Sequence, residues 1–301
     1  GWRTWCVRCL GVGRGSHEAL GAEFLHGVAA DVVLGAAGAL ADLGALQFLD
    51  DLVDVFARFD FGPLRLAKRE VYDVAANWKI LVEDYSECYH CPGVHPQLNA
   101  LTPYDLGEDI PARGLWKGGW QPLVGEALTM GLDKGSHSRP WLKGMTETDA
   151  KRIQYFAVWP NLLLSLHPDY LMVHMIEPLG PGRSRVVCDW YLHPDTLKLP
   201  DYDFSDAHGF WDMTNRQDWH VCELQQRGTA SSMLPPGRYS ELEASVQAFD
   251  LMVADRYAAD GKRTSRGWAA GLAPGDMEGI DFSDRQAARA AIAAKLAAAA
   301  E

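Results

Sequence analysis

Residues 77–96 read Asn-Trp-Lys-Ile-Leu-Val-Glu-Asp-Tyr-Ser-Glu-Cys-Tyr-His-Cys-Pro-Gly-Val-His-Pro, with two histidines after an apolar, helix-like segment. Apolar side chains recur there at helical intervals, at Ile80, Leu81, Val82, Tyr85 and Cys88. This spacing predicts a helix over residues 78–89, which the Pro92-Gly93 pair ends. In such a helix Glu87 and His90 lie one turn apart on the same face, and the break lets His95 turn back toward His90.

The side chains of this stretch suit a mononuclear metal site. Two imidazoles and one carboxylate form a ligand set that binds Fe(II) and leaves positions open for dioxygen. An imidazole that binds a metal gives its other N–H to an acceptor, and Glu87 is the candidate acceptor for His90. The carboxylate ligand must come from a distant segment, which offers Asp218, with Asp212 as a competing candidate. Alternatively, both histidines are ordinary surface or core residues and Asp218 is a solvated carboxylate, since such spacings also occur by chance.

The middle of the chain predicts an antiparallel sheet. Its apolar or alternating runs are separated by turn signals such as Pro160-Asn161, Pro168-Asp169 and Gly180-Pro181-Gly182. Turns at these intervals favour a meander, in which strands that follow one another in sequence also pair. The predicted strands of this meander are residues 115–124, 155–159, 162–167, 170–178 and 183–193, and residues 67–75 form a separate predicted strand that leads into Asn77.

Helices are predicted before and after this sheet. Residues 48–59 carry apolar side chains at helical spacing, and residues 205–226 form a second predicted helix with Ser205 as its N-cap. A third, residues 240–259, opens with a capping box of Ser240 and Glu243. Residues 283–301 are rich in alanine and predict a peripheral helix with little apolar face.

Composition and charge exclude several classes of protein. Of the 301 residues 48% are hydrophobic, which is typical of a soluble globular protein, and the formal net charge is −12. Nucleic-acid binding needs clustered Lys and Arg that the chain lacks, and no apolar run approaches the roughly 20 residues of a membrane helix. The N-terminus lacks the pattern of a signal peptide, so we expect a cytoplasmic protein. Six cysteines are too few for a disulfide scaffold, and reduced thiols are expected.

Residues 1–46 show neither strand alternation nor a capped helix before about Asp31. Cys6 and Cys9, with His17 and His26 downstream, could be offered as a zinc or iron–sulfur site. Structural zinc sites need a second tightly spaced ligand pair, which is missing here, so an irregular segment is favoured. The expected organisation is an atypical N-terminal remnant over residues 1–46, a mononuclear iron catalytic domain over residues 47–275 and a peripheral C-terminal helix over residues 276–301.

The region around the two histidines resembles the iron-site signature of Rieske non-haem iron oxygenase α subunits. The motifs that carry the resemblance are Asn77-Trp78-Lys79, Glu83-Asp84-Tyr85, Glu87-Cys88-Tyr89-His90 and His95-Pro96. The resemblance extends over about residues 48–272. It implies an α+β fold in which helices pack around an antiparallel sheet, a helix-grip arrangement like that of START domains.

This resemblance also implies roles for individual residues and partners. His90, His95 and Asp218 would bind mononuclear Fe(II), and Glu87 would face the [2Fe–2S] cluster of a neighbouring subunit. Asp84 stands where many members carry an amide near the iron. The family further implies O2 and a small organic molecule as substrates, a ferredoxin or flavin reductase as electron donor, and a homotrimer.

The segment from Tyr155 to Pro194 is most similar to the branch that acts on quaternary ammonium compounds such as glycine betaine, carnitine and choline. Hydroxylating an N-methyl group would give net N-demethylation. Aromatic faces hold such cations, although aromatics on strands are more often core residues; His167 and His174 are expected to be structural or pocket-lining. The candidate pocket residues are Trp159, Tyr170, Trp190, Tyr191, Trp211 and Trp219.

Two alternatives remain. One is an aromatic-ring hydroxylating dioxygenase, and the other is a non-catalytic or defective ligand-binding module on the same fold. The family's N-terminal domain holds its cluster through Cys-x-His and Cys-x-x-His pairs, and residues 1–46 contain neither pair. The chain begins at Gly1 rather than at methionine, so we expect a truncated chain whose first residues are read in a shifted frame, or a remodelled N-terminus. Either would remove the normal electron donor and leave this chain inactive by itself.

Overall fold

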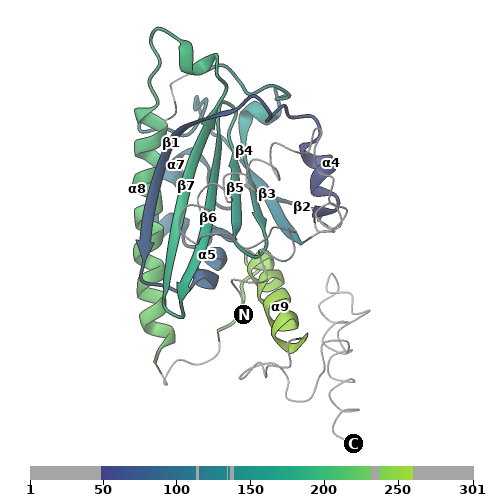
Figure 1. The fold of residues 1–301 in the computed structure, drawn as a ribbon, viewed down its shortest axis with the longest axis vertical. Coiled ribbons are helices and arrows are strands. Elements are labelled where there is room, and N and C mark those ends of the chain that lie inside the picture. The colour runs from purple at the N-terminus through teal and green to yellow at the C-terminus, as the bar shows by residue number, and fades with distance from the viewer. Residues whose placement is uncertain (1–48, 113–114, 134, 136–138, 232–236, 260–301) are drawn as a thin grey trace, which may run out of the picture. The chain divides into compact units, whose positions relative to one another are not determined.

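The computed structural model describes residues 49–112, 115–133, 135, 139–231 and 237–259 (Figure 1). The chain divides into two compact units, Gly1–Ser231 and Ser232–Glu301. The expectations for residues 1–46 and for a helix over residues 283–301 lie outside the described residues. In the described part of the chain, no helix is long and apolar enough to cross a membrane.

The first unit is built on an antiparallel sheet with strand order β1-β7-β6-β5-β4-β3-β2. The predicted α+β fold, an antiparallel sheet with helices around it, is confirmed. The strands are β1 (Arg65–Val74), β2 (Glu108–Ile110), β3 (Trp116–Pro122), β4 (Arg152–Val158), β5 (Leu162–Leu166), β6 (Leu171–Gly180) and β7 (Arg183–Leu192). The three residues of β2 are exposed or half-exposed and lack an apolar alternation, so no strand was predicted there.

Strand β1 differs from the other strands of this sheet because its only partner strand in the sheet, β7, is distant in sequence. It lies antiparallel to β7, with Arg69 opposite Asp189. The Arg69 guanidinium donates from Nε and Nη2 to the two carboxylate oxygens of Asp189, both at 2.6 Å. Asp189 is fully buried, and this bidentate pair gives its carboxylate a counter-ion.

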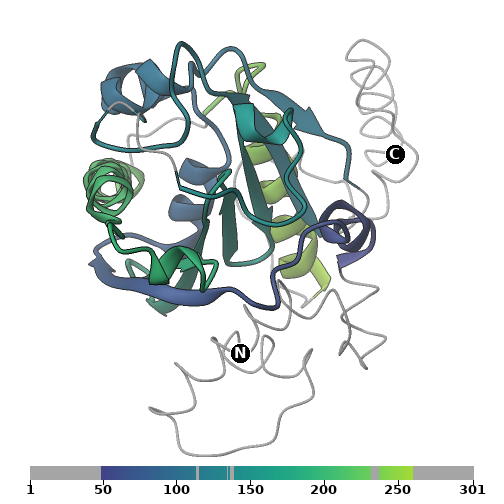
Figure 2. The same ribbon diagram turned by 90° about the horizontal axis from the view of Figure 1, so that it is seen from above.

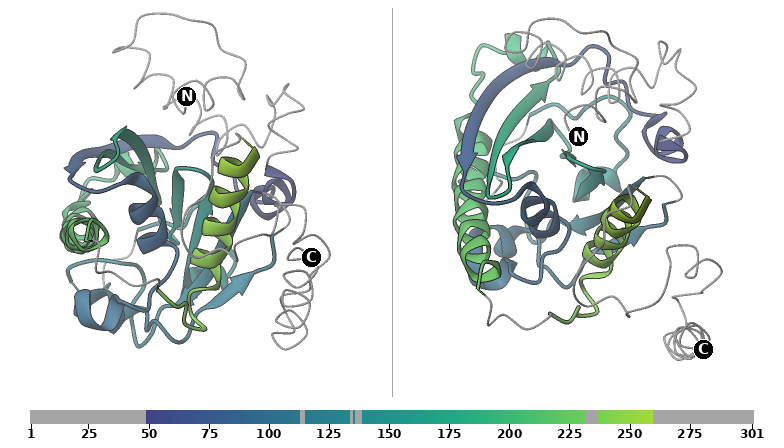
Figure 3. Two further views of the ribbon diagram at one scale, coloured as in Figure 1. Left: turned by 90° about the horizontal axis from the view of Figure 1, so that it is seen from below. Right: turned by 60° about the horizontal axis from the view of Figure 1, so that its bottom comes forward.

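The two faces of the sheet pack against different parts of the chain. Alternate residues of a strand point to opposite faces, and Leu171, Val173 and Met175 of β6 join an apolar core with Phe56 and Trp116. The residues between them, among them His174, therefore point to the other face, toward the helices α5 (Trp78–Tyr85) and α8 (Ser205–Thr229). Figures 2 and 3 show α5 within the curve of the sheet and α8 beside it.

The remaining elements of the first unit are short. They are α4 (Leu52–Phe56), α6 (Cys91–Val94), α7 (Pro96–Leu101) and two 3-10 turns at Asp149–Lys151 and Thr196–Lys198. The first helix is thus shorter than the predicted residues 48–59. Ser205 is not the N-cap of α8; instead Asp203 accepts hydrogen bonds from the Ser205 N–H and hydroxyl, at 2.9 and 3.0 Å.

The second unit contains α9 (Ala244–Ala259), which begins four residues later than predicted. The Glu243 carboxylate accepts from the Ser240 N–H at 2.5 Å, and the Ser240 hydroxyl accepts from the Leu242 N–H at 3.3 Å. The predicted capping interaction thus forms in part, in the turn that precedes the helix.

A buried cluster of ion pairs connects two loops of the first unit with α8. Arg139 is 4% exposed and donates from Nε to Asp169 at 2.6 Å and from Nη1 to Asp206 at 2.7 Å. Its guanidinium also lies over the rings of Tyr170 and Phe204. Burial raises the pKa of Asp169, an effect that Arg139 opposes. The carboxylate of Asp169 therefore depends on this arginine to stay charged.

Candidate metal centre

The loop after α5 carries the two predicted histidines. Asn77 caps α5, because its side chain accepts from the Lys79 N–H at 3.1 Å. The helix ends at Tyr85 rather than at residue 89 as predicted, and residues 86–90 form an irregular turn. His90 lies just before α6 and His95 between α6 and α7, where Pro96 begins the next helix. Two short helices that share His95 at their junction thus turn both imidazoles to one side.

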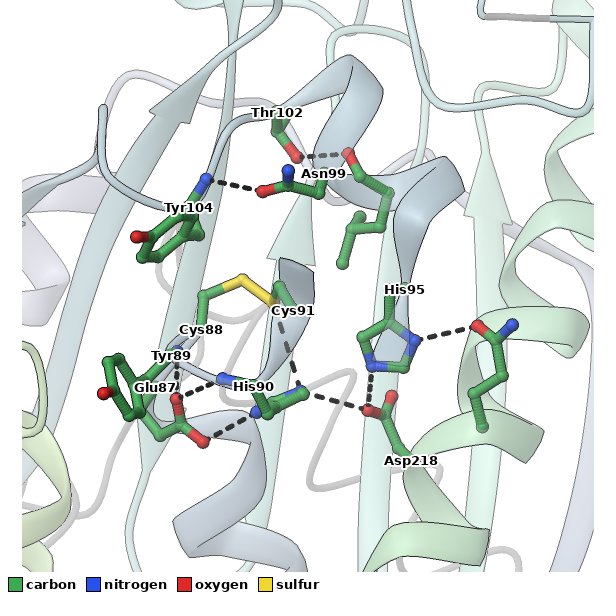
Figure 4. The surroundings of a disulfide bond; sticks show 12 residues. Glu87, Cys88, Tyr89, His90, Cys91, His95, Asn99, Thr102, Tyr104 and Asp218 are labelled. Carbon is green, nitrogen blue, oxygen red and sulfur yellow. Dashed lines mark hydrogen bonds and ion pairs between the residues drawn. A yellow bond between two sulfur atoms is a disulfide. The ribbon is translucent and has the colours of Figure 1, made fainter. Parts of the chain in front are cut away.

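Helix α8 brings the predicted carboxylate to these imidazoles. Asp218 Oδ1 lies 2.6 Å from His95 Nε2 and 3.4 Å from His90 Nε2 (Figure 4). The three ligand atoms all lie within 4.8 Å of one another and could hold a metal ion. The competing candidate, Asp212, lies elsewhere: it accepts from the Tyr72 hydroxyl and the Arg216 guanidinium, both at 2.9 Å.

Each imidazole has a separate partner for its other nitrogen. His90 Nδ1 lies 2.6 Å from Glu87 Oε1, and His95 Nδ1 lies 2.8 Å from Gln217 Oε1. Both Nδ1 atoms therefore donate, which leaves both Nε2 lone pairs facing the Asp218 carboxylate. Three electron-pair donors that face one another at these distances need a cation or a proton between them. The donor set and its tautomers thus fit a divalent metal such as Fe(II).

In the absence of a metal, protons take the place of the cation. Burial lowers the pKa of His90, but the hydrogen bonds with Asp218 and Glu87 outweigh it and raise the pKa to about 11. Burial raises the pKa of Asp218, yet its hydrogen bonds with His90 and His95 prevail and hold that pKa below its usual value. The centre thus favours an imidazolium beside a carboxylate, and a metal ion must displace that proton.

Asp84 is a second carboxyl group next to the centre. It is 9% exposed on α5, and its pKa is raised well above the usual value by burial and then by the negative charge of Asp218. Both causes disfavour a second negative charge beside Asp218.

Some of the predicted pocket aromatics lie near the centre, and others do not. Trp219, next to Asp218, lies with its ring 6.1 Å from His174, whose ring lies 6.2 Å from Tyr85. Tyr170 and Trp211 form a separate group, in which the Trp211 indole donates to the Tyr170 hydroxyl at 2.7 Å. His167 stacks on Tyr170 with ring centres 3.9 Å apart.

The other three candidates lie apart from Trp219. Tyr191 belongs to the apolar core on the opposite face of the sheet. Trp190 packs against His208, with ring centres 5.2 Å apart. Trp159 is buried in the turn between β4 and β5. For Tyr191 the register decides the position, because a shift of one residue exchanges the two faces of a strand.

Three functional features were missed at the sequence level. Gln217 contacts His95, and its place beside Asp218 was the available signal. Asn215, one turn earlier on α8, accepts from His174 Nε2 at 3.1 Å. Cys88 and Cys91 form a disulfide, so the expectation of reduced thiols was wrong for this pair; the Cys-x-x-Cys spacing was its signal.

Replacing Gln217 with Leu should weaken metal binding about tenfold, because the His95 ring loses the acceptor that fixes its tautomer and orientation. The dissociation constant for Co(II), measured by competition with a chromophoric chelator, checks this. The matched control is Gln225→Leu, at an exposed position of the same helix. An unchanged constant for the Gln217 variant would show that the amide has no orienting role.

His174 should make the metal-free protein less stable in mild acid. Burial lowers its pKa to about 4, although the Asn215 bond opposes this. The unfolded chain therefore binds the proton first, and stability falls as pH drops from about 6.5 toward 4. We expect a loss of about 2 kcal/mol between pH 7 and pH 5 that a His174→Gln variant does not show. Urea unfolding in EDTA at both pH values measures it, and the exposed His220→Gln variant should keep the wild-type loss.

Comparison with known proteins assigns the chain to a family. A sequence profile described as ring hydroxylating alpha subunit (catalytic domain) matches residues 61–259. The glycine betaine monooxygenase oxygenase subunit of Chromohalobacter salexigens is 28% identical over 222 residues, covering 64% of this chain and 50% of that protein. The putrescine 2-hydroxylase of Ralstonia nicotianae is 30% identical over 156 residues, covering 49% of this chain and 40% of that protein.

A solved structure shares the fold. The quaternary ammonium Rieske monooxygenase CntA superimposes with a TM-score of 0.52 at 19% identity, over 70% of this chain and 55% of that one. This chain spans about half the length of the first curated relative it matches. The profile match includes His90, His95 and Asp218, and it confirms the resemblance to Rieske oxygenase α subunits. The chain therefore belongs to the ring hydroxylating alpha subunit (catalytic domain) family.

Proposed function

We propose that His90, His95 and Asp218 hold a mononuclear Fe(II) ion, and that the domain uses it with O2 to hydroxylate a small nitrogen-containing molecule. The observation that carries this is the convergence of two imidazole nitrogens and one carboxylate oxygen within 4.8 Å of one another. A ligand set of this kind would leave coordination positions open for O2 and substrate.

The protein's own groups prepare this site. Glu87 and Gln217 keep the Nδ1 protons in place, so that both Nε2 lone pairs would be available to the ion. Asp218 contributes the negative charge that favours a divalent cation, and His95, 1% exposed, is shielded from water. Bound here, Fe(II) would supply the oxygen-activating chemistry that side chains lack.

A quaternary ammonium or other amine is the proposed substrate class. Such a cation is held by aromatic faces. Tyr85 and Trp219 lie against the His174 ring, and Tyr155 lies against Tyr85. The relatives' names support the class, since they include a glycine betaine monooxygenase subunit and a putrescine hydroxylase. If an N-methyl group is hydroxylated, the product loses formaldehyde and the net reaction is N-demethylation.

Electrons for this reaction would come from outside the domain. Glu87 contacts His90 and is only partly buried, beside Tyr89, which is 60% exposed. We propose that this surface receives electrons from a [2Fe–2S] cluster of a neighbouring subunit in a homotrimer, itself reduced by a ferredoxin or flavin reductase. The partial burial of Glu87 is the support that the described residues give.

Iron loading followed by nitric oxide binding tests the proposal. Protein loaded anaerobically with Fe(II) should bind about one ion per chain, and NO, which stands in for O2, should give the spectrum of an S = 3/2 iron–nitrosyl complex. With a reductase and a cluster-bearing partner subunit, glycine betaine or putrescine should stimulate O2 uptake, and formaldehyde should appear with the betaine. Absence of iron binding would contradict the metal site.

The same experiment separates the alternatives. If an aromatic substrate were converted to a diol, an aromatic-ring dioxygenase function would be favoured over the hydroxylation of an amine. A ligand that binds equally well with and without iron, in protein that takes up no O2, would favour the non-catalytic binding module.

A further inference from the structure

The disulfide between Cys88 and Cys91 encloses His90 in a short covalent ring (Figure 4). The two Cα atoms lie 5.0 Å apart, and the ring spans the turn that joins α5 to α6. Glu87, which holds His90 Nδ1, precedes the ring directly. The covalent bond therefore closes the segment that presents one candidate ligand and its hydrogen-bond partner.

Hydrogen bonds connect this ring to the second histidine. The Cys91 N–H donates to the Cys88 carbonyl at 3.1 Å, and the His95 N–H donates to the Cys91 carbonyl at 2.8 Å. The His90 carbonyl accepts from the Val94 N–H at 3.1 Å. A change in the turn at Cys88 is thus transmitted through Cys91 to the backbone of both His90 and His95.

The Cys91 sulfur also lies close to the His90 nitrogen that is the candidate metal ligand. Its sulfur lies 4.0 Å from His90 Nε2, the nitrogen that faces Asp218. The Cys91 side chain is buried, at 2% exposure, whereas Cys88 is partly exposed beside the exposed Tyr89. A small oxidant or reductant from solvent can therefore approach the pair from the side of Cys88, whereas Cys91 is shielded from solvent.

Global stability does not account for this bond. A disulfide stabilises mainly by closing long loops in the unfolded chain, and this one joins residues only three apart. Within the described residues, the free cysteines Cys188 and Cys222 are both buried, which makes them poor exchange partners. The bond acts locally, on the orientation of His90.

We propose that Cys88 and Cys91 are a reversible thiol–disulfide modification site whose closed form clamps the metal centre, an inference that rests on the proposed metal site. A hydroperoxide, ROOH, takes two electrons from the two thiols, so that the S–S bond forms and ROH and water leave. A dithiol reductant reverses this, because its own thiols become a disulfide and return two protons and two electrons to Cys88 and Cys91. In the closed form the ligand atoms stay assembled; in the open form the His90 turn loosens and metal affinity falls.

Cobalt titration of the two redox forms tests this. The background carries Cys6→Ser and Cys9→Ser, because these two lie outside the described residues. The protein is oxidised with H2O2 or reduced with a phosphine, desalted anaerobically and titrated with Co(II). We expect the reduced form to bind about tenfold more weakly and reoxidation to restore affinity. A Cys88→Ser, Cys91→Ser variant should bind weakly under both conditions.

The outcomes distinguish failure of the modification-site proposal from failure of the metal-site proposal on which it rests. Equal affinity in both redox forms, with His95→Ala abolishing binding, overturns the clamp and leaves the metal site intact. Binding that His95→Ala does not affect overturns the metal site. Tighter binding in the reduced form, with a sulfur-to-cobalt charge-transfer band that Cys91→Ser removes, makes Cys91 a ligand and overturns the clamp.

Discussion

Asp218→Asn should bind Fe(II) about 100-fold more weakly than the wild type, or worse. Removing an outer partner of a ligand already costs 10- to 100-fold in metal affinity, and here the ligand itself loses its charge. Asn is nearly isosteric, so the fold is retained, but its neutral amide replaces the one carboxylate that faces both imidazoles. Iron per chain after gel filtration, together with the Co(II) dissociation constant, measures the effect.

Asp212→Asn is the matched control, because Asp212 lies on the same helix and was the alternative ligand in the sequence. Its carboxylate pairs with Tyr72 and Arg216 and makes no contact with the histidines among the described interactions. We expect it to keep full iron. If Asp212→Asn lost iron while Asp218→Asn kept it, the assignment of the third ligand would be reversed.

Arg139→Met should lower the free energy of unfolding by about 3–5 kcal/mol, which is the usual cost of leaving a buried charge without its partner. Methionine fills much of the same space, so the loss comes chiefly from the carboxylates of Asp169 and Asp206. Burial alone raises the pKa of Asp169, and the variant must either keep that charge unpaired or bind a proton. Urea unfolding followed by tryptophan fluorescence measures the change.

Two further variants give this prediction its controls. Lys143→Ala removes an exposed pair with Asp60 and should leave the unfolding midpoint unchanged. Adding Asp169→Asn to Arg139→Met should recover part of the lost stability, because one of the two unpaired charges is gone. If the double variant were no more stable than the single one, the cost would lie in packing around Tyr170 and Phe204 instead.

The sequence predicted the sheet well because turn residues delimit its strands. Pro160-Asn161 and Gly180-Pro181-Gly182 fall between observed strands, and each run of apolar residues they separate is a strand in the structure. The register and the two faces were not predictable, and this is why Tyr191 was proposed for the pocket although it lies in the opposite core.

The candidate site was predictable in its ligands and not in its surroundings. Residue types and spacing pointed to His90 and His95 but left Asp212 as an alternative to Asp218, and the resemblance to the oxygenase family favoured Asp218. The helix end at Tyr85 and the orienting contact from Gln217 depend on how α5 and α8 pack, which no local pattern records. The disulfide likewise depends on a turn that brings two sulfurs together.

The pairing of β1 with β7 has a consequence for how the protein is made. Arg69 and Asp189 are 120 residues apart in sequence, and His95 and Asp218 are 123 apart. A ribosome delivers β1 and both histidines long before their partners exist, and contacts of such separation form late. Until β7 emerges, β1 lacks its partner strand, and until α8 emerges the histidines lack Asp218. We therefore expect metal to bind only after synthesis has passed Asp218, when β1 and β7 can already pair.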